Sequence, residues 1–503
     1  MKPTAKTVLS AAITISAVSF AHAEISQEHN QWFEQGQATL EKKLSVKPNK
    51  KTAKNIILFI ADGNGVTSNT AIRIFNGQLQ GQTGEEYVLS YEEFPHLALA
   101  KTYNINAQTP DSAGTATAFM SGVKTKAGVI GIDGEPLRGD CKGAVGHEVV
   151  SVLELAEMAG KSTGVVTTAR VTHATPAAAY AHSADRNWED NTSITPEMAA
   201  VGCTDIAAQA IEAGLDVVFG GGRRHFLPKE YIDGEGKKGK RTDNRNLTAE
   251  WLSKYDNASF IWNQDGFDKL DTETTGPVLG LFNSSHMEYE ADRAKDKGGE
   301  PSLAEMTTKA IEILDNNKKG FFLQVEAGRV DHAHHAGNAA RAVTDGVAFA
   351  EAVKAAVEMT SEQDTLIIVT ADHSHTLALQ GYAKRGNPIL GLSVGIDGQG
   401  LPKDEPNLAD DGKPYTTLSY ANGPGGVEGP REDLSSIDVD DVDFIQQALI
   451  PLKSSETHAG DDVAVYARGP GAWLLQGSIE QNYIFHVMDY AGKLRQKAEK
   501  ASK

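Results

Sequence analysis

Acidic and imidazole side chains gather at four points of the sequence, each beside a short apolar run that predicts a buried strand. Asp62 follows the first of these runs directly, and Glu326 follows another. Asp331 and His335 come a few residues later and are four positions apart, so one helical turn would place both on the same face. Carboxylate and imidazole ligands in combination favour zinc or a similar divalent metal ion.

The other two clusters are Asp372-His373-Ser374-His375 and Thr457-His458-Ala459-Gly460-Asp461. Asp372 and His373 are adjacent and would point to opposite faces of a regular strand, so the backbone must turn there if both bind metal. A single histidine is more often a satisfied core or surface residue than a ligand. Because several clusters each lie beside a predicted buried strand, coincidence is a poor explanation, and the pattern predicts a metal site built from several strand ends.

A nucleophile candidate lies in the segment Thr109-Pro110-Asp111-Ser112-Ala113-Gly114. Pro110 and Asp111 are typical of the start of a helix, and the residues after Ser112 are small. In one interpretation, Asp111 or Ser112 simply caps this helix. In the other, the Ser112 hydroxyl lies at a helix N-terminus, where backbone amides favour a phosphate. The segment alone is compatible with both interpretations.

The elements that must position these residues alternate along the chain. Strands are expected at residues 55–61, 163–167, 215–219, 321–325, 365–370 and 463–467, and helices at about 149–160, 204–213, 302–316 and 338–358. This alternation predicts an α/β fold with a doubly wound, mostly parallel central sheet and helices on both faces. Sites in such sheets gather at the carboxyl ends of the strands. Residues of about 225–300 and 376–455 are richer in Gly, Pro, Asp and Asn, which indicates two insertions in one core.

The composition excludes several classes of protein. The 503 residues include 48 basic and 67 acidic ones, for a net charge of −19, and this argues against a nucleic-acid-binding surface, which needs a basic face. With only two cysteines, the chain is not a disulfide framework.

The N-terminus is typical of a secretory signal peptide. Lys2 and Lys6 come first, an apolar run covers residues 8–20, and Ala21-His22-Ala23 provides a cleavage pattern, so residues 1–23 are expected to be removed. No other stretch predicts a membrane span, and the C-terminus lacks a lipid-anchor signal. We therefore expect a periplasmic or secreted protein. In that oxidising compartment Cys141 and Cys203 are expected to pair, with two free thiols as the alternative.

These motifs resemble those of the alkaline phosphatase family in order and context: Asp62, Asp111-Ser112-Ala113, Asp331 with His335, Asp372-His373, and His458. The stretches Val165–Thr168, Phe219–Arg223 and Glu456–Gly460 are also similar to that family, so the resemblance covers about residues 50–490. It implies one catalytic domain over residues 24–503 that hydrolyses many phosphate monoesters to an alcohol and inorganic phosphate. It also implies an alkaline pH optimum and a homodimer.

The resemblance assigns roles to individual residues. Ser112 would be the nucleophile that becomes phosphoserine, and Arg186 would bind the phosphate. Two zinc ions and one magnesium ion are implied. The first zinc would be held by Asp331, His335 and His458, the second by Asp62, Asp372 and His373 together with Ser112, and the magnesium by Asp62, Thr175 and Glu326.

Some features are similar to the animal members of the family rather than to the enterobacterial form. His173 and His332 are two of them, and both are expected to orient neighbouring ligands through hydrogen bonds without binding metal themselves. Cys141 and Cys203 fall where the animal enzymes have a disulfide. A weak additional calcium or magnesium site is implied by matching positions, in which an asparagine replaces an acid: Glu230, the carbonyl of Phe282, Asn283 and Glu300.

The second insertion resembles the crown subdomain of the animal enzymes, which lies at their dimer interface. Two alternatives to a phosphomonoesterase stay open. One is a phosphodiesterase or sulfatase-type relative on the same two-metal scaffold, although such relatives generally lack the equivalent of Ser112, Arg186 or the Glu326 site. The other is a secreted phosphate- or metal-binding protein, which would need the metals and not Ser112.

Overall fold

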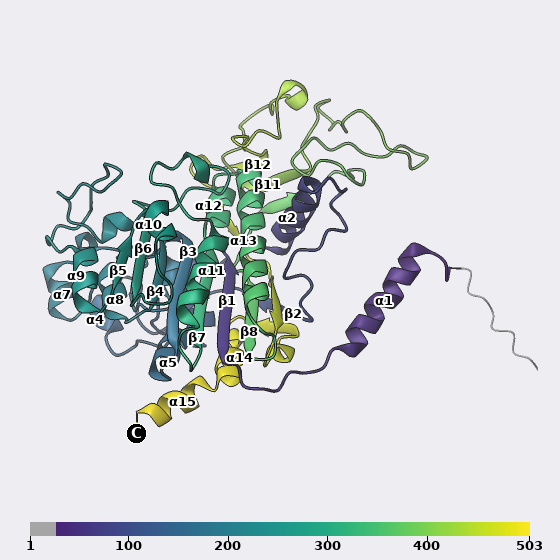
Figure 1. Cartoon of the computed structure of the whole chain (residues 1–503). Coiled ribbons are helices and arrows are strands. Elements are labelled where there is room, and N and C mark those ends of the chain that lie inside the picture. Colours follow the sequence, from purple (N-terminus) through teal and green to yellow (C-terminus); the bar gives the residue numbers. More distant parts are fainter. Residues whose placement is uncertain (1–26, 503) are drawn as a thin grey trace, which may run out of the picture. The chain divides into compact units, whose positions relative to one another are not determined.

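In the computed structural model, residues 27–502 are described, and they divide into two units, one ending at Lys47 and the other beginning at Pro48. The first unit contains helix α1 (Gln31–Ser45). The second contains all other helices and strands of the described residues (Figure 1). The predicted signal peptide, residues 1–23, lies outside the described residues. Among the described helices, none combines the length and apolar character that a membrane span needs.

A mixed ten-stranded sheet forms the centre of the second unit. Its strand order is β15-β2-β14-β8-β1-β7-β3-β4-β6-β5, and β14 is the strand that runs antiparallel to both of its neighbours. The strands are β1 (Asn55–Ala61), β2 (His96–Lys101), β3 (Ser162–Arg170), β4 (Val217–Gly221), β5 (Ser259–Ile261), β6 (Val278–Asn283), β7 (Phe321–Ala327), β8 (Thr365–Thr370), β14 (Val463–Arg468) and β15 (Gly477–Glu480). The predicted α/β fold with a mostly parallel sheet is confirmed.

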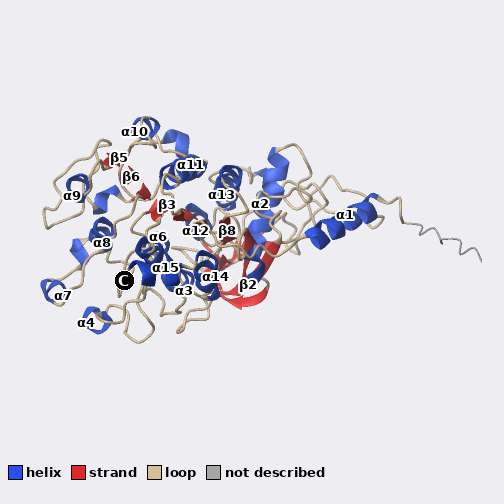
Figure 2. Ribbon diagram, turned by 60° about the horizontal axis from the view of Figure 1, so that its bottom comes forward, coloured by secondary structure: helices blue, strands red, loops and turns tan. Residues whose placement is uncertain are grey.

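Helices cover both faces of this sheet (Figure 2). In β1, Ile56, Leu58 and Ile60 face one hydrophobic core, while Ile57, Phe59 and Ala61 face the other. This is why the strand is apolar from Ile56 to Ala61. The first core is covered by α3 (Ser112–Ser121), α5 (Val152–Met158), α8 (Ile206–Glu212), α14 (Tyr483–Gly492) and α15 (Leu494–Ala501), and the second by α2 (Val66–Leu79), α11 (Leu303–Leu314) and α13 (Ala339–Met359). The remaining helices are α4 (Cys141–Ala144), α6 (Ala174–Ala177), α7 (Pro196–Ala200), α9 (Leu247–Lys254), α10 (Gln264–Asp268) and α12 (Arg329–His335).

The two expected insertions differ in how they join the core. Residues 377–451 carry a separate three-stranded sheet of β10 (Leu377–Leu379), β11 (Leu418–Gly423) and β12 (Ala448–Pro451), which Figure 1 shows beside α2. Residues 225–300, in contrast, supply β5 and β6 to the main sheet. The apolar run Val278–Phe282 of β6 lies within a Gly- and Pro-rich region, and the composition of that region hides it.

A disulfide joins Cys141 in α4 to Cys203 after α7, which confirms the predicted pairing. Its Cα atoms are 6.1 Å apart and the two residues are 62 positions apart in sequence. Cys141 packs in a small hydrophobic cluster of its own with Val129, Ile132 and Trp188. The bond therefore secures a segment that the two main cores do not reach.

Helix α13 buries a carboxyl group, Asp345, which is only 4% exposed and accepts a hydrogen bond from the backbone N–H of Glu290 (3.1 Å). Burial raises the pKa of Asp345 to about 8, although the Arg329 charge acts in the opposite direction. In the unfolded chain this carboxyl ionises near its ordinary value, so the folded state binds the extra proton between about pH 4 and pH 8. Stability is therefore lost as the pH rises through that window.

We expect Asp345→Asn, which keeps an acceptor for Glu290, to be more stable than the wild type, with a gap that widens between pH 6 and pH 9. The pKa of about 8 sets the widening at about 3 kcal/mol. Chemical denaturation at the two pH values measures it. Asp410→Asn, at an exposed position, is the matched control and should show no such widening. An equal gap at both pH values would contradict the titration of Asp345.

Candidate active site

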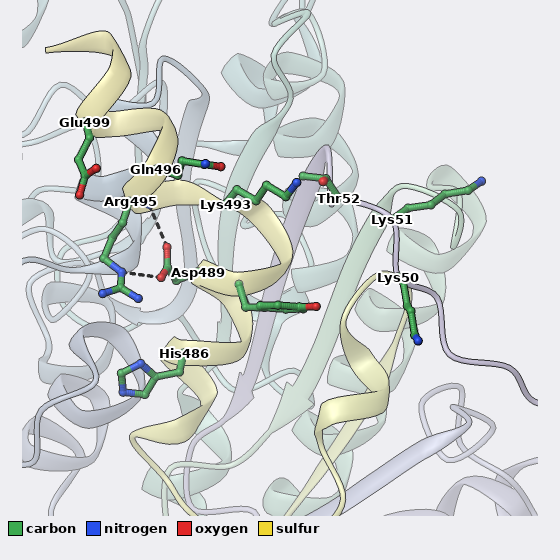
Figure 3. A pocket seen from close by; sticks show the side chains of 10 residues that line it. Lys50, Lys51, Thr52, His486, Asp489, Lys493, Arg495, Gln496 and Glu499 are labelled. Carbon is green, nitrogen blue, oxygen red and sulfur yellow. Dashed lines mark hydrogen bonds and ion pairs between the residues drawn. The ribbon is translucent and has the colours of Figure 1, made fainter. Parts of the chain in front are cut away.

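The amino ends of the parallel strands carry a surface cavity of about 660 Å³ between the segment before β1 and helices α14 and α15. Figure 3 shows that Lys50 and Lys51 point away from each other there, and that Arg495 is directed to Asp489, with which it forms an ion pair (2.6 Å). No convergent metal-type group of the described residues lies in this cavity. The predicted ligands lie at the other end of the strands.

The carboxyl ends of four neighbouring strands, β8, β1, β7 and β3, bring the predicted ligands together. Asp62 follows β1, Asp372 and His373 follow β8, and Glu326 is the last residue but one of β7. All four side chains are completely buried, although each is polar. The backbone leaves the strand after Thr370, which provides the turn that was expected at Asp372 and His373.

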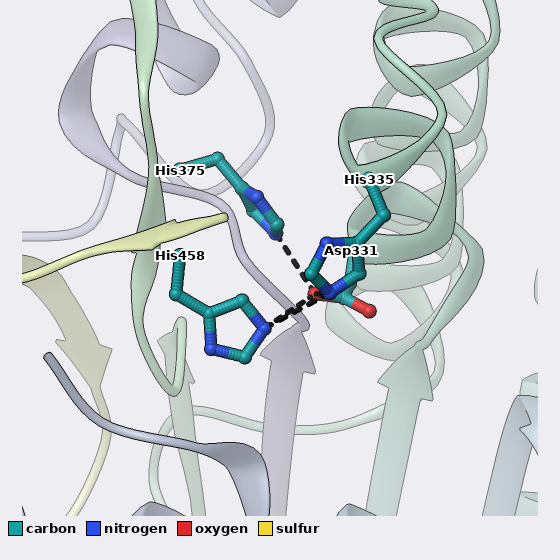
Figure 4. A group of neighbouring side chains, drawn as sticks. All are labelled: Asp331, His335, His375 and His458. Atoms are coloured by element: carbon teal, nitrogen blue, oxygen red, sulfur yellow. Dashed lines mark hydrogen bonds and ion pairs between the residues drawn. The ribbon is translucent and has the colours of Figure 1, made fainter. Parts of the chain in front are cut away.

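One group of ligand-type atoms consists of Asp331, His335, His375 and His458 (Figure 4). The Nε2 atoms of His375, His335 and His458 lie 2.8, 3.3 and 3.3 Å from Oδ1 of Asp331. Three of these residues are the predicted first zinc set. His375 is an addition: it stands in the quoted Asp372–His375 motif, but it enters the group only because β9 (Ser374–His375) pairs with β13 (His458–Ala459).

Each imidazole of this group makes a hydrogen bond through Nδ1, the nitrogen that points away from Asp331. Nδ1 of His375 bonds to Oε2 of Glu456 (2.5 Å), and Nδ1 of His335 bonds to the carbonyl oxygen of Glu456 (2.7 Å). Nδ1 of His458 bonds to the carbonyl oxygen of Pro110 (2.8 Å), next to the nucleophile segment. Each ring therefore presents Nε2 to the centre of the group, the arrangement that orients histidines for metal binding.

Two further groups share Asp62. One is Asp62, Asp372 and His373, in which Nε2 of His373 lies 3.3 Å from both carboxylates. The other is Asp62, Glu326 and His173, and Oγ1 of Thr175 lies 3.5 Å from Oδ2 of Asp62. The register pairs both Ile60 and Thr167 with Glu326, which places Glu326 between the ends of β1 and β3.

The donor set fits divalent cations. Oδ1 of Asp62, Oδ2 of Asp372 and Oε1 of Glu326 are buried and have no hydrogen-bond partner among the described residues. A buried charge without a partner is costly, so oxygens left in this way point to bound cations. The pKa of Asp62 points in the same direction. Burial and the charges of Asp372 and Asp331 raise it well above its usual value.

Ser112 lies beside these groups at the first turn of α3. Asp111 caps that helix by accepting a hydrogen bond from the N–H of Gly114 (3.1 Å), so the Ser112 hydroxyl is not used as a cap. Oγ of Ser112 is 3.2 Å from Nε2 of His373. The structure thus bears out the interpretation that Asp111 caps the helix, and it also leaves the Ser112 hydroxyl at the helix N-terminus, so the two interpretations of this segment hold together.

Arg186 lies on the same side of the groups. Its Nη1 donates to Oδ2 of Asp111 (3.0 Å), and its Nη2 lies 3.0 Å from Nε2 of His173. Burial acts to raise the pKa of Asp111, but Arg186 and two backbone N–H groups hold it below its usual value. Asp111 therefore caps α3 and anchors the guanidinium at the same time, which fixes Arg186 relative to Ser112.

Comparison with known proteins decides which family this arrangement represents. The family model described as alkaline phosphatase matches residues 53–494. The chain belongs to the alkaline phosphatase family. Its relatives include the rat tissue-nonspecific alkaline phosphatase, 46% identical over 482 residues that cover 93% of this chain and 89% of the relative. The alkaline phosphatase of the cod Gadus morhua is 45% identical over 92% of this chain and 97% of its own.

Solved structures agree on the fold. The alkaline phosphatase from the Antarctic bacterium TAB5 has a TM-score of 0.59 at 24% identity and covers 88% of this chain and 99% of its own. The enzyme from Thermus thermophilus has a TM-score of 0.62 at 23% identity, with coverage of 90% and 96%. As a member of this family, the chain is a metal-dependent phosphomonoesterase, and it has convergent groups of acidic and histidine side chains that could hold metal ions.

The remaining predicted positions of this alkaline phosphatase are placed less decisively. A ring nitrogen of His173 lies within 4.8 Å of oxygens of Asp62 and Glu326, and its orienting role stays a prediction. Asn283 donates to Glu300 (2.8 Å), while Glu230 is exposed. Among the described residues, neither Glu230 nor Glu300 belongs to a convergent metal-type group, so the additional site stays a prediction.

Proposed function

We propose that this alkaline phosphatase hydrolyses phosphate monoesters through a phosphoserine on Ser112. The observation that carries the proposal is the position of the Ser112 hydroxyl, at a helix N-terminus and 3.2 Å from Nε2 of His373. In the first step the Oγ–P bond forms as the ester P–O bond breaks, and the alcohol leaves with a proton. Water then attacks phosphorus as the Oγ–P bond breaks, which releases inorganic phosphate and returns a proton to the serine oxygen. Two displacements predict retention of configuration at phosphorus.

The residues present fit two zinc ions and one magnesium ion. Asp331, His335 and His458, with His375 beside them, would hold one zinc; Asp62, Asp372 and His373 would hold the other; the oxygen-rich Asp62, Thr175 and Glu326 would hold magnesium. Bound metal ions lower the pKa of oxygen ligands and stabilise developing charge on attacking and leaving oxygens.

The chain's own groups supply the binding of phosphate. The guanidinium of Arg186 offers a planar fork that matches two phosphate oxygens, and Asp111 holds it in place. The N-terminal N–H groups of α3 add partial positive charge at the same point. Because recognition centres on the phosphate, we infer a broad range of monoester substrates. Together with the proposed metal ions, these groups would make the surroundings of Ser112 positive, although the protein is acidic overall.

The proposal is tested by quenching the zinc- and magnesium-loaded enzyme with acid during turnover of a chromogenic phosphate monoester. Peptide mass spectrometry should find one phosphoryl group on Ser112. Parallel assays with a phosphate diester and a sulfate ester should give much lower kcat/KM values. A preference for either, or an unmodified Ser112, would contradict the proposal.

We also infer a secreted or periplasmic homodimer. The disulfide supports an oxidising compartment. The second insertion exposes large apolar side chains, among them Tyr382, Leu449 and Ile450, which supports an interface over this subdomain. Light scattering of the purified protein measures the mass, and a monomer at micromolar concentration would contradict the dimer.

A further inference from the structure

Three imidazole rings pack together beside the Asp62–Glu326 group. His173 follows β3 and His332 lies on α12, whereas His286 comes from the loop after β6, two strands farther along the sheet. The ring centroids of His286 and His332 are 4.0 Å apart, and His173 lies 5.4 Å from His286 and 5.5 Å from His332. His286 is absent from every set of site residues considered above, yet its ring contacts both of the others.

His286 is anchored on its far side. Its Nδ1 accepts a hydrogen bond from the backbone N–H of Arg170 (3.3 Å), and the Nη1 of the same residue contacts its Nε2. The Arg170 guanidinium is in turn held by Glu189 through two hydrogen bonds of 2.7 Å. The ring of His286 is therefore attached to a partly buried ion pair outside the metal groups.

Within the described part of the chain, each of the other two rings has one nitrogen without a hydrogen-bond partner. Nδ1 of His173 and Nδ1 of His332 are buried and have no hydrogen-bond partner among the described residues. His173 bonds through Nε2 to Arg186 (3.0 Å), and its ring nitrogen lies within 4.8 Å of oxygens of Asp62 and Glu326. The orientation of His173 thus affects both the predicted magnesium group and the predicted phosphate-binding arginine.

We propose that His286 is a positioning residue for the third metal group: its anchored ring holds His332 and His173 in place, and His173 transmits that orientation to the metal ligands and to Arg186. This inference rests on the proposed function, because it requires that the Asp62–Glu326 group binds magnesium and that Arg186 binds phosphate. It predicts that the site needs the ring of His286 for the contacts with His332 and His173, and its nitrogens for the contacts with Arg170 that hold the ring.

The test compares His286→Ala, which removes the ring, with His286→Phe, which keeps a ring of similar size. Zinc-loaded, magnesium-free enzyme is titrated with MgCl₂, and half-saturation is read from the shift in melting temperature and from the metal content after gel filtration. The magnesium concentration at half-saturation should be at least about tenfold higher for His286→Ala than for wild type, which is the usual effect of losing a residue that orients metal ligands. It should also raise KM and the inhibition constant of inorganic phosphate more than it lowers kcat.

His286→Phe keeps the ring and loses the contacts with Arg170, so it should recover part of both effects. The matched control is His486→Ala, in the cavity at the amino ends of the strands, which should resemble wild type throughout. The inference would be overturned if His286→Ala reached half-saturation at the same magnesium concentration as wild type. A lower melting temperature with unchanged affinities for magnesium and phosphate would also overturn it, because that result marks a merely structural role. If wild type itself shows neither phosphoserine nor a magnesium response, the proposed function fails, whereas a normal wild type matched by His286→Ala defeats only this inference.

Discussion

Replacing Ser112 by alanine is expected to lower kcat/KM for a phosphate monoester by about a thousandfold or more, the scale seen when a catalytic nucleophile is deleted. The variant loses the hydroxyl that lies 3.2 Å from Nε2 of His373. The helix itself should survive, because Asp111 and not Ser112 provides the cap. Steady-state kinetics on zinc- and magnesium-loaded protein measures the effect, with metal content determined on the same sample.

A matched control is available in the same helix. Ser121→Ala removes a hydroxyl that bonds to the carbonyl oxygen of Thr117 (2.6 Å) at the far end of α3. This variant should keep near wild-type kcat/KM, with a modest loss of stability. If Ser112→Ala retained more than about a tenth of the wild-type value while Ser121→Ala behaved normally, covalent catalysis by Ser112 would be ruled out.

Removing the bound metal is expected to lower activity by at least about a thousandfold, because charge stabilisation by metal ions lowers the activation barrier by several kcal/mol. It should also lower the melting temperature. Without cations, the buried carboxylates of Asp62, Asp372 and Glu326 either repel one another or bind protons, and burial raises the pKa of Glu326 to about 7. At a thousandfold excess over Kd, a bound ion adds about 4 kcal/mol to the stability of the folded state.

The measurement uses chelation followed by gel filtration, with elemental analysis, differential scanning calorimetry and activity on the same protein. Zinc together with magnesium should restore both activity and melting temperature. Calcium alone should not, because it prefers six to eight oxygen ligands and these groups are rich in imidazole nitrogen. Full activity in protein shown to be free of metal would contradict the assignment of all three groups.

Most of the site could be predicted because its residues follow apolar strands directly. Asp62, Glu326, Asp372 and His373 all lie at the ends of runs that are recognisable by their apolar character. In a parallel sheet such ends converge, so the local pattern was enough to place these side chains in one region. Ser112 was recognisable as a candidate from its helix-start signal, although the sequence left open whether Asp111 or Ser112 caps the helix, and the structure has the cap at Asp111.

The residues that sequence reasoning missed share a different property: they reach the site through contacts that no local pattern records. His375 joins the first group because β9 pairs with β13, more than eighty positions away in sequence. Glu456 was noted only as family-like sequence, yet it holds two of the four ligand-type side chains. For His286 the only signal would have been the strand β6, hidden in a region that the composition marked as an insertion.

Without coordinates, the alternation of expected strands and helices predicted the α/β fold, and the motifs beside the strand ends, together with the family resemblance, predicted an enzyme with a metal site and a serine at a helix start. The tertiary structure added which side chains meet. Apolar strands and helix caps are indicated by residues that are neighbours in sequence, so a local pattern can predict them. The order β8-β1-β7-β3-β4-β6 and the register between strands depend on packing of segments far apart in sequence, and these contacts alone bring His375 to Asp331 and His286 to His332 and His173.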